Sequence, residues 1–166
     1  MTTKPPPVTL RYELTPADRD AVRDIVASTG FFSPAEIDVA IELVDERLSK
    51  GPASGYEFVL AYSDGQTVAY TCYGPIAGTQ SSFDLYWIAV RHGQRGSGLG
   101  RLLMDETERR IALAGGRRVY AETSNRAQYA PTRAFYERCG YLREAVIVDF
   151  YAPGDDKVIY VKVVDA

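Results

Sequence analysis

The sequence has little of what metal or disulfide chemistry requires. Its 166 residues include one histidine, His92, and two cysteines, Cys72 and Cys139. A lone histidine cannot build a histidine-rich metal site, and the cysteines show no metal-ligand spacing. Both cysteines lie inside apolar patterns, which predicts two buried thiols rather than a disulfide. We therefore expect no bound metal, and we expect His92 to be a solvated loop residue.

A broad basic surface and a long apolar run are also missing. The formal net charge is −3 at pH 7, whereas general nucleic-acid binding needs an excess of basic residues. No apolar run is long enough to cross a membrane. The first residues, MTTKPPPV, lack the apolar segment of a signal peptide. These features predict a cytoplasmic protein that binds neither nucleic acid nor membrane.

The length suits a single domain, with residues 1–7 as a disordered tail and 8–166 as the folded part. Two helix starts carry capping signals, TPAD at 15–18 and SPAE at 33–36. The order β-α-α-β-β-β-α-β-α-β-β predicts one mixed α/β (α+β) domain built on a central sheet. The expected elements are a strand at 8–14, helices at 16–30 and 34–50, a hairpin of 56–62 with 67–74, a strand at 83–90, a helix at 99–114, a strand at 117–124, a helix at 130–140, and strands at 141–151 and 157–164.

What the sequence does have is a glycine-rich basic loop in front of a helix. Residues 91–101, RHGQRGSGLGR, hold four glycines and three arginines. Glycines let a backbone approach a ligand closely, and a helix N-terminus offers free N–H groups with partial positive charge. This predicts a phosphate site. A Walker A loop would need Lys-Ser/Thr after its last glycine, and a dinucleotide fingerprint would follow the first strand of a βαβ unit. Neither pattern fits, and a ligand-free glycine turn is the remaining alternative.

Residues 95–100 read RGSGLG after a strand that ends in WIAV, and APTRAFYERCGY follows downstream at 130–141. These two motifs together resemble those of the GNAT family, the Gcn5-related N-acetyltransferases. RGSGLG matches the Arg/Gln-x-x-Gly-x-Gly/Ala signature, and WIAV is similar to the end of the family's fourth strand. Downstream, APTRAFYERCGY resembles its fourth helix, in which Tyr136, Gly140 and Tyr141 occupy the common tyrosine, glycine and aromatic positions. The element order agrees as well, so the resemblance covers about residues 8–164.

The resemblance implies acetyl-coenzyme A (acetyl-CoA) as the co-substrate. Charge at its phosphates would come from Arg95 and Arg101, with Arg91 as a further candidate. The backbone N–H groups that would cradle the pyrophosphate belong to Gly96, Ser97, Gly98, Leu99, Gly100 and Arg101. The pantetheine arm would pair like an added strand with Ile88, Ala89 and Val90, and the N–H of Ala89 or Val90 would polarise the thioester carbonyl. Asn125 lies where the family often has an asparagine near the pantetheine.

Acetylation of an amine needs a base for the amine proton and an acid for the departing thiolate. Tyr136 is the expected acid, because it occupies the family's tyrosine position; the alternative is a packing role in its helix. Glu122 is the expected base, because ribosomal-protein alanine acetyltransferases carry a glutamate in this strand. The segment after Glu122, NRAQYAP, is longer here than in those enzymes. An ordinary strand-end carboxylate is the other reading of Glu122, and Asp84 or Tyr86 could act instead through water.

The expected function is transfer of an acetyl group to a primary amine of a small molecule. Two alternatives stay open: acetylation of a protein N-terminus, and a non-catalytic acyl-CoA-binding domain. Phe31 and Phe32, and the acidic segment 149–156, lie where the family places acceptor-side elements; core packing and a plain hairpin turn are their other readings. Some of the twelve tyrosines could also line an acceptor pocket, with Tyr73, Tyr86, Tyr129 and Tyr151 as candidates. The sequence does not decide whether the protein forms a homodimer.

Overall fold

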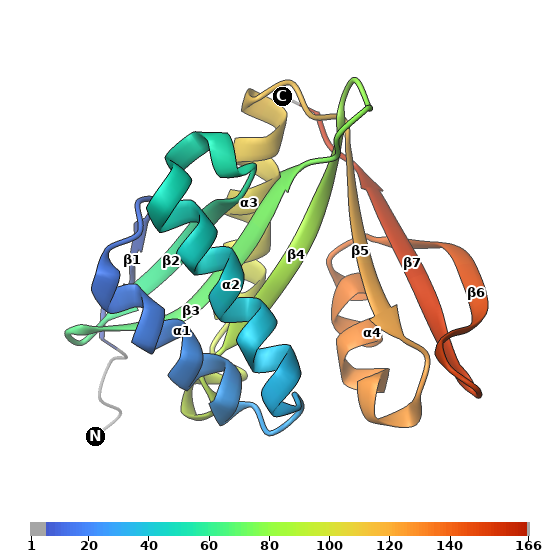
Figure 1. Ribbon diagram of the computed structural model, residues 1–166, viewed down its shortest axis with the longest axis horizontal. Coiled ribbons are helices and arrows are strands. Elements are labelled where there is room, and N and C mark those ends of the chain that lie inside the picture. Colours follow the sequence, from blue (N-terminus) through green and yellow to red (C-terminus); the bar gives the residue numbers. More distant parts are fainter. Residues whose placement is uncertain (1–5, 166) are drawn as a thin grey trace. The chain divides into compact units, whose positions relative to one another are not determined.

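The computed structural model describes residues 6–165 as a mixed sheet with four helices (Figure 1). The predicted tail, residues 1–7, lies outside the described part except for residues 6 and 7. Hydrogen bonds join the strands in the order β1-β2-β3-β4-β5-β7-β6. The elements are β1 Thr9–Arg11, α1 Pro16–Ser28, α2 Pro34–Lys50, β2 Glu57–Ser63, β3 Gln66–Pro75, β4 Ser82–Val90, α3 Leu99–Leu113, β5 Arg118–Ser124, α4 Ala130–Arg138, β6 Leu142–Ala152 and β7 Asp155–Val163. The predicted fold class and element order are confirmed.

The helix signals of the sequence act as predicted. The Ser33 hydroxyl accepts the Glu36 N–H at 3.2 Å, and the Glu36 carboxylate accepts the Ser33 N–H at 2.7 Å, a reciprocal capping box. Gly51 ends α2 with φ +60°, a conformation that favours glycine. The first strand is shorter than expected. Only three residues of β1 pair with β2, because the chain then turns into the cap of α1 at Thr15.

Contacts divide the chain into two compact units, which β4 and α3 both traverse. The first unit runs to Tyr73 and includes Trp87–Thr107. In it, α1 and α2 cover one face of β1 to β4 while α3 lies behind the strands (Figure 1). The core between α1, α2 and the strands consists of Val22, Ile25, Val26, Ala40, Ile41, Val44, Phe58, Leu60, Tyr70, Cys72 and Ala89. The face of α2 that packs on the strands carries Ala40, Ile41 and Val44.

A buried carboxylate connects the start of α1 to the strands. Asp18 is 3% exposed and accepts a hydrogen bond from Arg11 Nη2 at 2.8 Å, another from the Thr15 N–H at 2.8 Å, and a third from the Thr67 hydroxyl at 3.2 Å. Burial by itself raises the pKa of Asp18, but the hydrogen bonds from Arg11 and Thr15 outweigh it and hold that pKa below its ordinary value. The ionised carboxylate thus bridges β1, α1 and β3.

The second unit comprises Gly74–Tyr86 and the chain from Glu108 onward. Its strands β5, β7 and β6 are antiparallel, and the first half of β4 pairs parallel with β5. Glu108, on α3, accepts hydrogen bonds from Lys162 Nζ at 2.6 Å and from the Tyr141 hydroxyl at 3.1 Å. Lys162 also donates to the Cys139 carbonyl at 2.8 Å, which ties the end of α4 to β7.

At position 116, in the turn between α3 and β5, glycine is required by the lack of space for a side chain and not by its backbone angles. A Cβ there would lie 2.4 Å from Ile111 Cγ2, 2.9 Å from the Ile111 carbonyl oxygen and 2.8 Å from Phe83 Cδ2. The glycine therefore allows the last turn of α3 to approach the start of β5.

The two cysteines, Cys72 and Cys139, are buried free thiols, as the sequence predicts. Burial raises the pKa of the Cys72 thiol well above its ordinary value. Within residues 6–165, no helix is both long and apolar enough to span a bilayer.

Candidate active site

The glycine loop opens toward solvent in front of α3. Gly96 and Gly98 have φ of +77° and +84°, and a Cβ added to either would meet no atom within 4 Å. The Leu102 N–H donates to the Gly98 carbonyl at 3.0 Å, which begins the helix. The N–H groups of Leu99 and Gly100 precede that bond, in the first turn of the helix, where no carbonyl four residues earlier belongs to the helix. Open glycines followed by the first N–H groups of a helix are the arrangement that binds a phosphate.

The three arginines of the loop differ in their surroundings. Arg95 and Arg101 are exposed; Arg95 lies over the Phe31 ring at 5.3 Å and Arg101 Nε lies 3.2 Å from Asp105 Oδ1. Arg91, in contrast, is half-buried and bonded to strand β3. Its Nη2 donates to the Thr67 carbonyl at 3.1 Å, and its Nε is buried without a hydrogen-bond partner among the described residues. Arg95 and Arg101 are therefore better placed to meet an anion than Arg91.

Two backbone N–H groups fix the first residues of the loop. The Arg91 N–H donates to the Val68 carbonyl at 2.8 Å, and the His92 N–H donates to the Ser28 hydroxyl at 3.1 Å. His92 is exposed, as predicted for a solvated loop residue. Of the two aromatic residues between α1 and α2, Phe31 contacts Arg95, while Phe32 packs edge-on against Trp87 with ring centroids 4.9 Å apart. The α1–α2 connection is thus in contact with the glycine loop.

The second half of β4 holds the backbone expected to meet the pantetheine arm. The parallel ladder between β4 and β5 consists of Ser82–Leu85 with Arg118–Ala121. Ile88, Ala89 and Val90 come after that ladder. Ala89 is buried in the core of the first unit, whereas Ile88 and Val90 are half-buried. Side chains therefore anchor this stretch, and the β4–β5 ladder ends before it.

In the second unit, Glu122 belongs to a cluster of charges that the sequence did not reveal. Lys157 Nζ, on β7, lies 2.6 Å from Glu122 Oε2 and 4.1 Å from the centre of the Phe150 ring. The Lys157 side chain is 12% exposed and that of Glu122 is 43% exposed. Asp84, on β4, is half-buried; burial first, and the charge of Glu122 second, raise its pKa, although Lys157 acts in the opposite direction. The two candidate bases thus interact electrostatically.

Tyr136 is buried in an aromatic cluster. Its ring centroid lies 5.8 Å from that of Tyr141 and 5.6 Å from that of Tyr160, and the residue is 6% exposed. Burial raises the pKa of its hydroxyl, with smaller contributions from Cys139 and neighbouring tyrosines. The hydroxyl therefore stays protonated across the physiological range, which a proton donor requires, but it is a weaker acid than an ordinary tyrosine.

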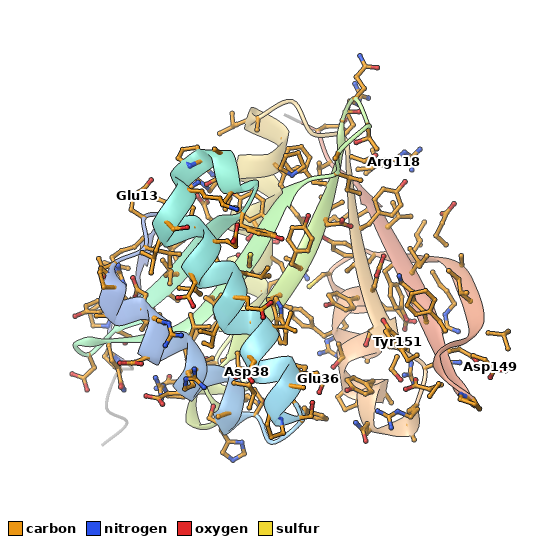
Figure 2. The ribbon with its side chains drawn as sticks, viewed as in Figure 1. Glu13, Glu36, Asp38, Arg118, Asp149 and Tyr151 are labelled. Atoms are coloured by element: carbon orange, nitrogen blue, oxygen red, sulfur yellow. The ribbon has the colours of Figure 1, made fainter. Side chains whose placement is uncertain are left out.

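Two further candidates of this unit, Asn125 and Tyr151, lie beside and on the hairpin of β6 and β7. Asn125 is exposed, and its N–H donates to the Asp156 carbonyl at 2.9 Å. Tyr151 is exposed on β6 (Figure 2), and burial of its hydroxyl together with the charge of Glu122 raises its pKa. Sequence reasoning missed Lys157 and Phe150, because only the strand register brings them to Glu122.

Comparison with known proteins identifies the family. Residues 54–143, more than half of the chain, match the family described as acetyltransferase (GNAT) domain. A crystal structure from Desulfovibrio desulfuricans, described as a candidate acetyltransferase of the GNAT family, is similar over 95% of this chain and 99% of its own. It has 51% sequence identity and a TM-score of 0.93. No protein with a curated description matches the sequence.

Two more distant structures share the fold. The ribosomal-protein-S18-alanine N-acetyltransferase of Escherichia coli is 20% identical, with a TM-score of 0.73 over 96% of this chain and 95% of that one. An aminoglycoside 6'-N-acetyltransferase in complex with coenzyme A is 17% identical, with a TM-score of 0.74 over 93% and 96%. The family match and the similarity at 51% identity show that the chain belongs to the GNAT family and is an acetyl-CoA-dependent N-acetyltransferase.

Proposed function

We propose that this protein transfers the acetyl group of acetyl-CoA to a primary amine of a small molecule, by direct attack of the amine on the thioester. GNAT acetyltransferases use acetyl-CoA as donor and acetylate amine acceptors. The observation that carries the proposal is the open glycine loop, where Gly96 and Gly98 leave space above a helix N-terminus flanked by two exposed arginines. A pyrophosphate fits that combination of N–H donors and charge.

In this proposal the donor is held in two places. The N–H groups from Gly96 to Arg101 bind the pyrophosphate, and Arg95 and Arg101 neutralise part of its charge. The backbone of Ile88, Ala89 and Val90 pairs with the pantetheine arm, and an N–H of Ala89 or Val90 stabilises the oxyanion that forms on the thioester carbonyl. Asn125 contributes a polar contact to the arm.

The second unit supplies the proton transfers. The amine must lose a proton as its nitrogen bonds to the carbonyl carbon, and the sulfur must gain one as the C–S bond breaks. We assign the first transfer to Glu122, directly or through water, and the second to the Tyr136 hydroxyl. Asp84 is the alternative base, because its raised pKa brings it closer to the working pH. The negative charges of Glu122 and Asp84 also suit a cationic amine.

A protein N-terminus is the second candidate acceptor, and one observation favours it. Glu122 lies on β5, and ribosomal-protein alanine acetyltransferases carry a glutamate in the corresponding strand. The Escherichia coli S18-alanine enzyme also has a similar fold. That enzyme is only 20% identical, however, which supports the shared fold alone.

The acceptor class can be tested by measuring free CoA and acetylated product over a panel of small amines and of peptides with free N-termini. We expect small primary amines to be acetylated with saturation kinetics, and peptides to react weakly. Turnover with peptides alone would favour the second candidate. Absence of product with every acceptor, while acetyl-CoA still binds, would point to the non-catalytic alternative.

The donor site can be tested with Gly98→Asp. The added carboxylate would stand where the pyrophosphate binds, and the lost charge-assisted hydrogen bonds, about 1.5–3 kcal/mol, correspond to about 10–100-fold weaker binding of acetyl-CoA by calorimetry. Gly78→Asp is the matched control, because Gly78 has a similar φ of +78° and equally open surroundings in another loop. If acetyl-CoA binding were weakened equally in both variants, or unchanged in both, the glycine loop would be ruled out as the pyrophosphate site.

The base can be identified from the dependence of kcat on pH. If Glu122 is the base, Glu122→Gln should lower kcat by about 10²-fold or more and remove the acidic limb of the profile, while the affinity for acetyl-CoA stays the same. Asp84→Asn is the comparison. As the solution is acidified, a base with a raised pKa becomes protonated, and therefore inactive, at a higher pH than an ordinary carboxylate. The role would belong to Asp84 if the acidic limb lay well above the ordinary range of carboxylates and disappeared only in Asp84→Asn.

The acid can be tested with Tyr136→Phe, which removes one oxygen and keeps the ring in its aromatic cluster. We expect kcat to fall by about 10²–10⁴-fold, while coenzyme affinity changes by no more than one hydrogen bond, about 0.5–1.5 kcal/mol. An acetyl donor with a better leaving group should partly restore the rate. Tyr160→Phe in the same cluster is the control and should retain kcat. A wild-type rate in Tyr136→Phe would return Tyr136 to a packing role.

A further inference from the structure

Lys157 is held away from water and against Glu122. Its Nζ lies 2.6 Å from Glu122 Oε2, and its side chain is only 12% exposed. The ion pair of Lys50 with Glu46 on α2 is equally short at 2.6 Å, but there the lysine is 58% exposed. Exposed pairs of that kind contribute little to a protein, whereas a lysine is seldom buried unless a carboxylate accompanies it. The pair at Glu122 therefore has a different standing in the structure from a surface ion pair.

The register of three strands brings Lys157 to two carboxylates. Lys157 on β7 pairs with Ser124 on β5, and Glu122 lies two residues before Ser124, on the same face of the strand. Lys157 and Glu122 are therefore diagonal neighbours across the two strands. Asp84 on β4 pairs with Tyr120, which precedes Glu122 by two residues and shares its face. One lysine thus lies on the same sheet face as both candidate bases.

A bulge in β6 covers the lysine. The ladder of β6 with β7 is interrupted after Ile147, and residues 148–151 of β6 stand opposite residue 156 of β7 alone. A bulge bends its strand and redirects the side chains that it carries, and bulges are frequent beside active sites. Phe150 lies in this bulge, and the centre of its ring is 4.1 Å from Lys157 Nζ. The bulge thus sets an aromatic face against the lysine ammonium.

Hydrogen bonds hold the bulge in shape. Asp149, labelled at the outer margin of β6 in Figure 2, has a φ of +55°. Its N–H donates to the Asp156 carboxylate at 2.9 Å, and its own carboxylate accepts the Gly154 N–H at 2.8 Å. A residue with a side chain adopts positive φ at a cost in free energy, and such conformations cluster at functional sites. The ring over Lys157 is therefore carried by a segment with its own specific bonds.

The charge of Lys157 acts on both carboxylates. It lies in direct contact with Glu122, and it opposes the rise in the pKa of Asp84 that burial and the charge of Glu122 cause. When all three groups are ionised, the set keeps one net negative charge instead of two. The titratable and charged side chains connected to this set through Glu122 and through one another are Tyr151, Asp155, Tyr129 and Arg126.

We propose that Lys157 is a positioning residue of the acetyl transfer, which orients Glu122 and offsets its charge so that the site accepts the acceptor amine in its neutral form. The proposal rests on the proposed function, with Glu122 as the base. Only a neutral amine can attack the thioester, and a free amine is mostly protonated at pH 7. Two carboxylates without a cation beside them would stabilise the ammonium form. Lys157 reduces that stabilisation and leaves one negative charge to attract the amine.

Kinetics of Lys157→Met test the role, with the small primary amine that reacts fastest in the acceptor panel as the probe. We expect kcat to fall by up to about 10²-fold, because Glu122 loses its orientation. The acidic limb of kcat should move up by about one pH unit or more, because the carboxylates lose the cation that favours their ionised forms. The KM for the amine should fall, since the ammonium form now binds better, whereas a merely structural role would raise it.

Three further variants separate charge from orientation. Lys157→Arg keeps the charge and should return kcat and the acidic limb toward the wild type. Lys157→Gln can still donate a hydrogen bond to Glu122, so it should retain more kcat than Lys157→Met while showing the same shift of the limb. Lys50→Met is the matched control, because it breaks an equally short but exposed ion pair, and it should change none of these quantities. Circular dichroism checks that every variant is folded.

Carbon-13 NMR of the Asp84 carboxyl group gives a test that needs no acceptor. Its titration should move to higher pH in Lys157→Met, because the charge that lowers its pKa is gone, and should stay in place in Lys50→Met. An unmoved titration of Asp84, or a raised KM in Lys157→Met, would overturn the proposal.

The outcome for Glu122→Gln separates this proposal from the assignment of the base. A loss of kcat in Glu122→Gln together with a wild-type pH profile in Lys157→Met would overturn the role of Lys157 alone. A wild-type kcat in Glu122→Gln would instead overturn Glu122 as the base, and the role of Lys157 with it.

Discussion

The buried carboxylate of Asp18 is the interaction on which the first unit depends. It receives hydrogen bonds from Arg11 on β1, from the cap of α1 and from Thr67 on β3. The carbonyl of Thr67 in turn accepts Arg91, the residue that leads into the glycine loop. A single ionised group thus joins the outermost strand, the first helix and the strand that holds the loop in place. The start of the loop is therefore held to the strands, while Gly96 and Gly98 stay open.

Most of the fold could be predicted from local signals. Capping boxes at Thr15 and Ser33 and the stop at Gly51 set the ends of the first two helices, because these residues satisfy helix ends whatever the tertiary packing. The length of β1 could not be predicted, since it depends on how many residues of β2 it can reach. The exposure of β6 could not be predicted either: its apolar run indicates a covered strand, and burial is a property of what lies beside it.

The candidate site likewise contains features that could be predicted from the sequence and features that could not. The glycine loop was readable, because glycine at positive φ and arginine beside a helix start are local features. The different surroundings of Arg91 and Arg95 were not, since they depend on Thr67 and Phe31, far away in sequence. The pairing of Glu122 with Lys157 was hidden for a similar reason, because only the register of β5 and β7 brings the two together. Features within one segment can be predicted from the sequence, whereas the charged neighbours of a residue on another strand can be identified only once the strand register is known.

Gly116 has a consequence for how related sequences can vary. Glycines with positive φ, such as Gly96 and Gly98, can give way to asparagine at modest strain, so a glycine kept at these positions in relatives would reflect the ligand more than the backbone. At Gly116 a Cβ would collide with the backbone oxygen of Ile111 as well as with side chains, and no other residue avoids that. This position should therefore stay glycine even in relatives that have lost the coenzyme or changed their acceptor. Comparing how often Gly116 and the loop glycines are kept in relatives would therefore separate positions conserved for packing from positions conserved for coenzyme binding.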